Sequence, residues 1–452
     1  MTGIYTRLVS KLLFPLHERL KKHGTVAIKA QLEKSQWLPK DKIIQAQNER
    51  LQQFIAKVNE DVPYYKALFN TLGLSSSDIN SVADLHKLPF LDKTTIRENY
   101  SGLKSSQAGA VSSFTTGGSS GTPLTFLLGD ERVSHDVAEK WRATRWWDVD
   151  IGDKEIVAWG SPIELGAQDK VRILRDKLFR STLIPAFDVD ESKLLGFIDK
   201  IKSIQPQMLF GYPSVFSLIA KLALAQKIDL TQLGIKVVFV TSERLYPYQR
   251  EIIVQAFGAP VANGYGSRDA GFIAHQCPSG SMHISAEDLI VEIIGNDGKV
   301  VADGEKGEIV VTHMATSDFP FIRYRTGDIA ALDTNPCACG RGLPVLKDIE
   351  GRTTDFVVAA NGTMMHGLAL IYILRELDGI EEFKIIQETK LLTRVQIVPS
   401  QNSELSSELR GKITAGFKAR LGDEVIIELE IIQQIEAEKS GKFRYVISRV
   451  AS

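Results

Sequence analysis

The stretch "TTGGSSGTP" (115–123) combines hydroxyl side chains and glycines without a single charged residue. Glycines let a backbone approach a ligand closely, and consecutive N–H groups and hydroxyls suit phosphate oxygens. The stretch is not a Walker A motif, because Thr122-Pro123-Leu124 stands where the lysine of that motif would be required. Taken alone, it predicts either a phosphate-binding loop or a flexible linker. The candidate ligand-binding residues are Thr115, Thr116, Gly117, Gly118, Ser119, Ser120, Gly121 and Thr122.

All three cysteines and one histidine form a second set with chemical potential. Cys337 and Cys339 lie in "NPCACGRG", while Cys277 begins and His283 ends "CPSGSMH". A Cys-x-Cys pair, plus a Cys and a His joined by a short turn, supplies four ligands suited to tetrahedral zinc. Protein ligands would fill every position, so such a zinc would be structural. Three buried thiols in a reducing compartment explain the same residues, and the spacing leaves both interpretations open.

The elements that must position these residues follow an α/β pattern. Apolar, β-rich runs at 155–160, 207–211 and 236–241 alternate with helical patterns at 213–227 and 246–258. Strands separated by helices predict an α/β fold with mostly parallel sheets covered by helices. From about residue 281, short strands joined by turns predict a small antiparallel or barrel-like addition, with Asn296-Asp297-Gly298 as a hairpin turn.

The pattern changes again after residue 351 and predicts two domains. Residues 1–351 would form a large N-terminal domain, with a helical extension over 1–70 and a β-rich section over 281–350 that zinc would pin. Residues 352–452 would form a small, mobile α+β domain. Its strands are expected near 354–360, 381–389, 391–398 and 424–432, and its helices near 367–377 and 402–420.

Composition excludes several classes of protein. The 452 residues are 44% hydrophobic. The chain has 54 Lys and Arg residues and 55 Asp and Glu residues, so it lacks the excess of positive charge that is typical of nucleic-acid-binding proteins. No apolar run is long enough for a transmembrane segment and no signal peptide is recognisable, which predicts a cytoplasmic protein. A homodimer stays open.

The N-terminal segment predicts an amphipathic helix. Its apolar side carries Leu8, Leu12, Leu13 and Leu16, surrounded by Arg7, Lys11, Arg19, Lys21 and Lys22. Such a helix either docks on its own domain or rests on a membrane surface as a peripheral contact.

Five motifs occur in order along the chain. They are "TTGGSSGTP", "NGYGSRDAG" (263–271), "FIRYRTGD" (321–328), "GRTTDF" (351–356) and "SGKFR" (440–444). This ordered set resembles the acyl-adenylate-forming (AMP-binding) superfamily, in particular its phenylacetate–CoA ligase-like branch, from about residue 50 to the C-terminus. The N-terminal "LLFPLHERLKKHGT" is similar to the capsular-polysaccharide-associated subgroup. Zinc ligands of the Cys…His…Cys-x-Cys kind also occur in that branch.

The resemblance implies a role for each matching residue. The Gly/Ser/Thr loop would bind the β- and γ-phosphates of ATP, and Tyr265 would lie on the adenine face. Asp328 and Arg352 would bind the ribose hydroxyls, and Lys442 would approach the carboxylate and α-phosphate. Asp269 stands where a Glu usually helps to hold Mg²⁺, and Asp355 matches the hinge between domains. Gly266, Ser267 and Arg268 complete the nucleotide motif, and the acyl pocket would be lined by Tyr212, Pro213, Ser214 and Phe216.

The implied reaction joins two anions, ATP and a carboxylic acid, so it needs positioning and charge neutralisation. Pyrophosphate would leave, and the acyl-adenylate would pass to a thiol, with coenzyme A favoured. Two alternatives remain. One is an adenylate-forming enzyme of a polysaccharide or cofactor pathway with another acceptor. The other is a non-catalytic, zinc-stabilised nucleotide-binding protein, because Thr122 and Arg268-Asp269 depart from the usual Lys and Thr-Glu.

Overall fold

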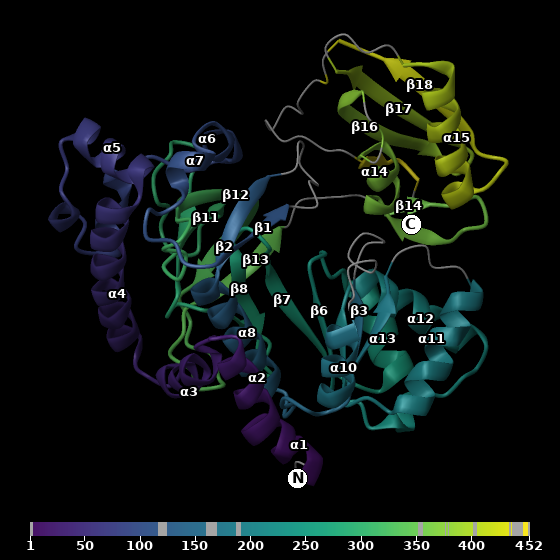
Figure 1. Ribbon diagram of the computed structural model, residues 1–452. Helices are drawn as coiled ribbons and strands as arrows, with labels where there is room; N and C mark the ends of the chain where they lie inside the picture. Colours follow the sequence, from purple (N-terminus) through teal and green to yellow (C-terminus); the bar gives the residue numbers. More distant parts are fainter. Residues whose placement is uncertain are drawn as a thin grey trace. The chain divides into compact units, whose positions relative to one another are not determined.

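The computed structural model describes residues 3–115, 124–159, 170–186, 191–350, 356–375, 377, 379–400, 405–433, 435 and 446–450. The chain divides into two compact units. The first contains Met1–Phe114, Leu124–Pro185 and Glu191–Gly351, and the second contains Thr115–Pro123, Ala186–Asp190 and Arg352–Ser452. Figure 1 labels many of the helices and strands of each unit.

The first unit begins with helices. They are α1 (Ile4–Leu8), the π-helical turn η1 (Val9–Leu13), α2 (Phe14–Leu20), α3 (Thr25–Ser35), α4 (Lys40–Asp61) and α5 (Pro63–Leu72). In α4 the buried residues Leu51, Phe54, Ile55 and Val58 recur at helical spacing, so one face packs into the core. Pro63 occupies the first turn of α5, and Gly73 ends that helix with φ of +65°.

Short elements lead from these helices to the sheet. They are η2 (Ser76–Asp78), η3 (Val82–Lys87), α6 (Lys93–Glu98), α7 (Tyr100–Leu103), the paired strands β1 (Val111–Thr115) and β2 (Thr125–Gly129), and α8 (Asp130–Arg145). The helix α8 packs against a strand of the main sheet, β8 (Gly271–Gln276).

An eleven-stranded mixed sheet, in the order β10-β11-β12-β13-β9-β8-β7-β6-β5-β3-β4, dominates the first unit. Its parallel part consists of β3 (Glu155–Trp159), β4 (Ser181–Pro185), β5 (Met208–Gly211), β6 (Val237–Thr241) and β7 (Val261–Ser267). All five residues of β6 are buried, as expected for a parallel strand covered on both faces.

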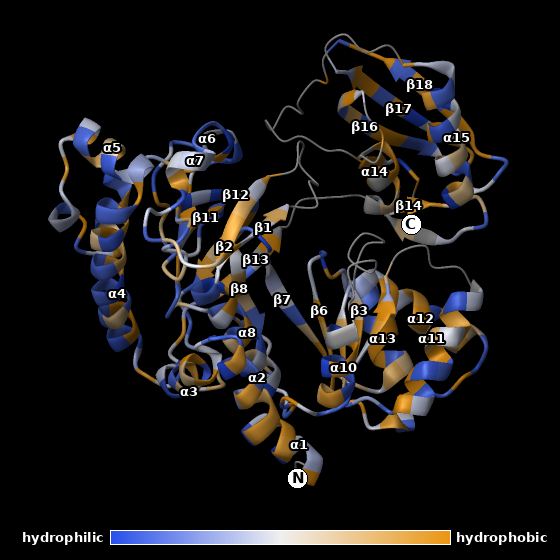
Figure 2. Ribbon diagram, viewed as in Figure 1, coloured by the Kyte–Doolittle hydropathy of each residue, from blue (hydrophilic) through white to orange (hydrophobic). Residues whose placement is uncertain are grey.

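Helices connect the parallel strands. They are α10 (Lys170–Phe179), α11 (Glu191–Ile204), α12 (Pro213–Ala225), η4 (Thr231–Leu233) and α13 (Pro247–Phe257). Figure 2 colours much of α12 and α13 orange, and the buried residues of α12 include Val215, Phe216, Ile219 and Ala220. The predicted α/β class and the helices at 213–227 and 246–258 are confirmed.

The antiparallel strands predicted after residue 281 are present. They are β9 (Met282–Ile284), β10 (Leu289–Ile294), β11 (Gly307–His313), β12 (Phe321–Asp333) and β13 (Val345–Glu350). They continue the same sheet, because β8 pairs antiparallel with both β7 and β9. The predicted turn at 296–298 also forms, since the amide of Gly298 donates to the carbonyl of Gly295 and Gly298 has φ of +77°.

The second unit contains a four-stranded sheet in the order β18-β17-β16-β19, in addition to the short pair β14 (Phe356–Val358) and β15 (Met364–His366). Its other elements are α14 (Leu368–Arg375), β16 (Ile380–Thr389), β17 (Leu392–Pro399), α15 (Ser407–Leu421), β18 (Ile426–Ile431) and β19 (Val446–Ser448). Ile385, Val395, Ile413 and Phe417 belong to a core that the unit builds for itself.

Candidate functional site

Two segments of the same pattern, Tyr-x-x-x-Asp, meet in the first unit. Tyr265 and Asp269 belong to β7 and the turn after it, and Tyr324 and Asp328 belong to β12. The hydroxyl of Tyr265 donates to Oδ2 of Asp328 at 2.8 Å. The hydroxyl of Tyr324 donates to Oδ2 of Asp269 at 2.6 Å. Each segment therefore supplies the tyrosine that orients the other's carboxylate.

The turn between β7 and β8 has little room for side chains. A Cβ atom on Gly266 would lie 2.2 Å from the carbonyl oxygen of Gly271, and Gly271 itself has φ of +96°. The pairing of the two strands also shifts register between Tyr265 and Gly266. Only glycine fits such a close backbone approach, which explains the spacing of glycines in "GYGSRDAG".

Asp269 is almost fully buried, at 5% exposure, and its carboxylate is held from two sides. The hydroxyl of Ser267 and the amide of Ala270 donate to Oδ1, while Tyr324 donates to Oδ2. Hydrogen bonds to a carboxylate fix its direction. Asp269 is thus a preoriented carboxylate in the turn after a parallel strand.

Arg132 of α8 supports the backbone of this turn. Arg132 was not identified from the sequence as part of the site. It projects from α8, is 1% exposed, and donates to the carbonyls of Arg268 and Asp269, each at 3.4 Å. Its Nε lies 3.0 Å from both carboxylate oxygens of Asp136. The fork of a guanidinium can serve both partners at once. In the sequence, Arg132 and Asp136 form an ordinary i,i+4 pair, which usually indicates a solvent-exposed helix face.

His313 lies beside this pair and stays uncharged at neutral pH. Its Nε2 is 3.9 Å from Oδ1 of Asp136, and the ring is completely buried. Burial, reinforced by the charge of Arg132, lowers the pKa of His313 to about 4. The ion pair of Arg132 and Asp136 therefore supports the turn next to a neutral imidazole.

Three of the four predicted pocket residues, Tyr212, Pro213 and Ser214, lie at the carboxyl edge of the parallel strands, the same edge at which Tyr265 lies. Tyr212 follows β5 directly, and its ring stacks on Trp159 at the end of β3, with ring centroids 4.8 Å apart. Ligands of open α/β sheets bind at this edge. Pro213 and Ser214 begin α12, and the amide of Ser214 donates to Glu243. Phe216 is fully buried and packs in the interior.

Other predicted site residues are described only in part or not at all. Thr115 is the last residue of β1 and is exposed, and Ser267 and Arg268 are exposed beside Asp269. Ten predicted site residues lie outside the described residues. They are Thr116, Gly117, Gly118, Ser119, Ser120, Gly121 and Thr122 of the phosphate loop, Arg352, the hinge residue Asp355, and Lys442.

The four predicted zinc ligands converge in the first unit. The ligand atoms of Cys277, His283, Cys337 and Cys339 all lie within 4.8 Å of one another. Cys277 comes from the end of β8, His283 from β9, and the other two from the segment between β12 and β13. The cluster therefore joins residues about 60 positions apart in the sequence, as the sequence-based hypothesis required.

The geometry of the cluster fits zinc. The Sγ atoms of Cys277 and Cys337 are 3.6 Å apart, close to the roughly 3.8 Å edge of a tetrahedron with Zn–S bonds of about 2.3 Å. Nδ1 of His283 lies 3.1 Å from the carbonyl oxygen of Leu343, to which it can donate when it carries the ring proton. In that tautomer Nε2 has a free lone pair, and this atom lies 3.2 Å from Sγ of Cys339. Burial lowers the pKa of His283 to about 4, which keeps the ring neutral as a metal ligand must be.

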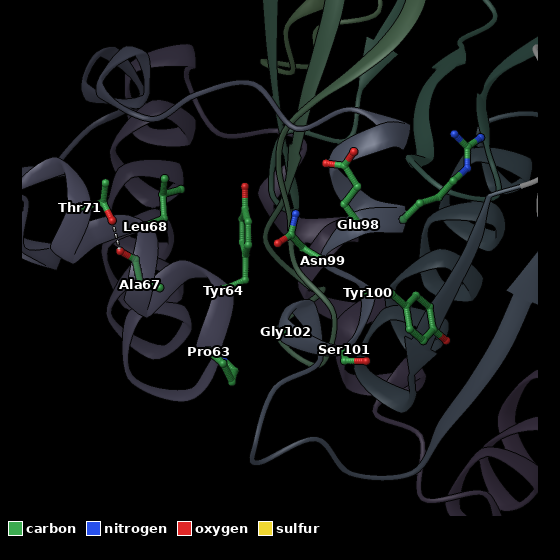
Figure 3. Close-up of a pocket in the computed structure, with 11 residues that line it drawn as sticks. Pro63, Tyr64, Ala67, Leu68, Thr71, Glu98, Asn99, Tyr100, Ser101 and Gly102 are labelled. Carbon is green, nitrogen blue, oxygen red and sulfur yellow. Dashed lines mark hydrogen bonds between the residues drawn. The ribbon is translucent and has the colours of Figure 1, made fainter.

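An open groove of about 560 Å³ lies elsewhere on the first unit, between α5 and the pair α6–α7 (Figure 3). Its lining mixes Tyr64 and Leu68 on one side with Glu98, Asn99 and Tyr100 on the other. None of the predicted site residues lines it. Separately, the described helices include none that is long and apolar enough to cross a membrane.

Sequence similarity to known proteins extends over both units of the chain. Residues 357–449 match the family model described as the CapK C-terminal domain. The chain is 25% identical over 418 residues to Protein CapK of Staphylococcus aureus, covering 90% of each chain. It is 22% identical over 414 residues to phenylacetate-coenzyme A ligase of Thermus thermophilus, covering 88% of this chain and 87% of the relative.

A solved structure of 2-hydroxyisobutyryl-CoA ligase, in complex with 2-HIB-AMP and CoA, has the same fold. The TM-score is 0.66 at 20% identity, with 92% of this chain and 91% of that chain covered. The resemblance predicted from the five motifs is therefore confirmed, since phenylacetate-coenzyme A ligases are among the relatives and the fold is that of an acyl-CoA ligase.

Proposed function

We propose that this protein is an ATP-dependent, adenylate-forming acid ligase. It joins a carboxylic acid to the α-phosphate of ATP, releases pyrophosphate, and then transfers the acyl group to an acceptor thiol. Coenzyme A is the favoured acceptor. It is part of the names of two similar proteins, phenylacetate-coenzyme A ligase and 2-hydroxyisobutyryl-CoA ligase.

The observation that carries this proposal is the meeting of "NGYGSRD" with "YRTGD". Tyr265 contacts Asp328, and Tyr324 contacts Asp269, at the carboxyl edge of a parallel sheet. A nucleotide bound there would find an aromatic ring, a carboxylate for the ribose hydroxyls and a second, preoriented carboxylate within one site. The carboxyl edge of the strands is also where ligands of open α/β sheets bind.

In the first half-reaction, Tyr265 packs on the adenine and Asp328 accepts hydrogen bonds from the ribose hydroxyls, with Arg352 donating beside it. The loop from Thr115 to Thr122 holds the outer phosphates through amides and hydroxyls. Lys442 neutralises the charge that the carboxylate and the α-phosphate share. The attacking carboxylate oxygen bonds to phosphorus while the bond to the pyrophosphate oxygen breaks, so the enzyme needs no nucleophile of its own.

The residues present also fit a magnesium ion. Asp269 offers hard carboxylate oxygens, and Mg²⁺ typically uses one or two carboxylates together with substrate phosphates and water. When bound, the ion would supply neutralising charge at the phosphates. Asp269 would be its protein ligand, kept in direction by Ser267 and Tyr324.

The acid would bind beside the stacked rings of Tyr212 and Trp159. Pro213 and Ser214 border the same edge at the start of α12, while Phe216 acts from the interior by holding α12 on the sheet. Apolar and aromatic lining with few polar groups suits an aryl or alkyl acid. In the second half-reaction the unit that contains Arg352–Ser452 would turn about Asp355 to admit the acceptor.

A second candidate keeps the adenylation step and changes the acceptor. The match of residues 357–449 to the CapK C-terminal domain and the 25% identity to Protein CapK favour it, because neither name specifies coenzyme A. In this version the acyl group passes to a hydroxyl or amine in a polysaccharide or cofactor pathway. The active-site roles of Tyr265, Asp269, Asp328 and Lys442 are the same in both candidates.

Exchange of labelled pyrophosphate into ATP tests the proposed activity directly. We expect exchange that depends on a carboxylic acid, measured over a panel of aryl, alkyl and sugar-linked acids. Mass spectrometry of the products with and without CoA then identifies the acceptor, and acyl-AMP that accumulates unchanged in the presence of CoA favours the second candidate. ATP binding without exchange for any acid would instead support a non-catalytic nucleotide-binding protein.

A further inference from the structure

The N-terminal helix presents a row of apolar side chains to solvent. Its three parts, α1, η1 and α2, run without interruption from Ile4 to Leu20. Every fourth residue along it is aliphatic and exposed, with exposed fractions between 43% and 90%. These residues are Ile4, Leu8, Leu12, Leu16 and Leu20, here called the N-terminal apolar row. Figure 2 shows the orange colour of this segment around α1, at the end of the chain marked N.

This exposure is not the result of a loose end, because the opposite face is firmly docked. Val9 is fully buried, and a Cβ on Gly152 would lie 2.5 Å from it. The hydroxyl of Thr6 donates to Asp153 at 2.8 Å, and Phe14 packs edge-on against Phe179. The helix therefore uses one face to bind its own domain and keeps the leucines on the other. The sequence left two interpretations open, docking on the helix's own domain or contact with a membrane surface. The structure shows the docking, and the exposed face is still accessible for a membrane contact.

The π-helical turn η1 helps to keep the row straight. In an α-helix a residue four positions on lies beyond one full turn, so a row with that spacing drifts around the helix. A π-helical turn is closed by i→i+5 hydrogen bonds and contains more residues, so four positions fall short of a full turn. With Val9–Leu13 in this conformation, the drift before and after the turn is partly reversed.

The charge of this surface has one sign. The exposed charged residues between positions 3 and 22 are Arg7, Lys11, Arg19, Lys21 and Lys22, and all are cations. Glu18 is the one acid in that range of the sequence, and it is buried, with hydrogen bonds from Thr25 and contacts to His17 and His23. Arg7, Lys11 and Arg19 each directly precede a member of the N-terminal apolar row.

A second amphipathic helix, α10, lies against the first. The hydroxyl of Tyr5 donates to the carbonyl of Leu178 at 3.0 Å, and Phe179 contacts both Phe14 and His17. This helix also exposes aliphatic and cationic side chains. They are Ile173, Leu174 and Leu178, together with Arg172 and Lys177.

We propose that the N-terminal apolar row and the exposed residues of α10 form a docking surface for an anionic lipid bilayer. Aliphatic side chains insert between the acyl chains at the interface, while flanking lysines and arginines contact acidic headgroups. A second copy of this chain is a poorer occupant, because two surfaces of the same charge repel each other. Attachment through one face of a helix is peripheral and reversible.

Vesicle sedimentation with the full-length protein tests this proposal, and it does not depend on the proposed enzyme activity. The probes are vesicles of phosphatidylcholine alone and of an equal mixture of phosphatidylcholine and phosphatidylglycerol. We expect at least about tenfold stronger partitioning onto the mixed vesicles, weakened by added salt. The triple variant Leu8→Gln/Leu12→Gln/Leu16→Gln should reduce this partitioning by about tenfold or more.

A matched control removes three exposed aliphatic side chains from the other unit, in Leu391→Gln/Ile426→Gln/Ile431→Gln, and should bind the vesicles as the wild type does. The melting temperature identifies any variant that fails to fold. If the leucine variant fails to fold, Lys11→Gln/Lys21→Gln/Lys22→Gln is the second test. We expect this variant to lose the preference for the anionic vesicles. The proposal is wrong if the wild type ignores mixed vesicles. It is also wrong if the leucine variant binds them unchanged, or if its only effect is to convert a dimer into a monomer.

Discussion

The hydroxyl of Tyr265 donates a 2.8 Å hydrogen bond to the carboxylate of Asp328, although the two residues are 63 positions apart in the sequence. The bond joins the end of the parallel part of the sheet to the antiparallel strand β12. It orients a carboxylate beside an aromatic ring, and we propose that the nucleoside of ATP binds to these two groups.

Removing either partner should weaken ATP binding. A hydrogen bond to a charged group contributes about 1.5–3 kcal/mol, so Tyr265→Phe and Asp328→Asn should each raise the KM for ATP about tenfold or more. Pyrophosphate exchange at varied ATP concentration measures this. Tyr248→Phe and Asp333→Asn are the matched controls, since Tyr248 is a partly exposed tyrosine on α13 and Asp333 ends the same strand as Asp328. Equal KM values in all four variants would contradict the assigned nucleotide site.

Lys442 should matter for chemistry more than for binding. Lys442→Ala should reduce pyrophosphate exchange by about a hundredfold or more while ATP binding stays within a few fold, because electrostatic stabilisation acts mainly on the charge that develops in the transition state. Lys439→Ala, three positions earlier on the same segment, is the control and should retain near-normal exchange. If the two alanine variants behave alike, Lys442 is not the cation of the reaction.

The cysteine cluster should bind one zinc ion that stabilises the fold. Protein purified without chelator should contain zinc in a one-to-one ratio by elemental mass spectrometry. Cys337→Ser should lose the ion and destabilise the first unit by about 4 kcal/mol or more, as loss of a structural metal typically does. Ser279→Ala, in the same turn as Cys277 but not part of the cluster, should keep both the zinc and the stability. If the purified wild type contains no zinc, the zinc hypothesis is wrong and the three cysteines are free thiols.

Acid should destabilise the first unit through buried histidines. Burial, followed by the charge of Arg142, lowers the pKa of His275 to about 3, against 6.5 for the ordinary side chain. Between these values the unfolded chain binds a proton that the folded chain does not, so the free energy of unfolding falls as the pH falls from about 6.5. His275 alone contributes a slope of up to about 1.4 kcal/mol per pH unit.

His275→Gln should therefore show a shallower dependence of stability on pH between about 4 and 6.5 than the wild type. Urea unfolding followed by tryptophan fluorescence measures it, because all five tryptophans lie in the first unit. His86→Gln, an exposed histidine, should leave the slope unchanged. Parallel curves for wild type and His275→Gln would mean that His275 is protonated in the folded protein.

Much of the fold could be predicted from local patterns alone. The strands ending at Trp159, Gly211 and Thr241 and the helices beginning at Pro213 and Pro247 have strong hydrophobic periodicity and clear end signals. The four residues of the cysteine cluster could also be predicted, because their chemical type is rare in this chain. The continuity of the parallel and antiparallel strands could not, since it depends on how β8 pairs with both β7 and β9.

The sequence by itself determined which residue types are present and how they are spaced: the two Tyr-x-x-x-Asp segments, the glycines between them, and the row of aliphatic residues at the N-terminus. Only the tertiary structure decided which tyrosine faces which aspartate, that Arg132 is buried behind the turn at Asp269, and which face of the N-terminal helix meets solvent. The physical reason is that local spacing acts along one element, whereas burial and pairing depend on distant segments that compete for the same core.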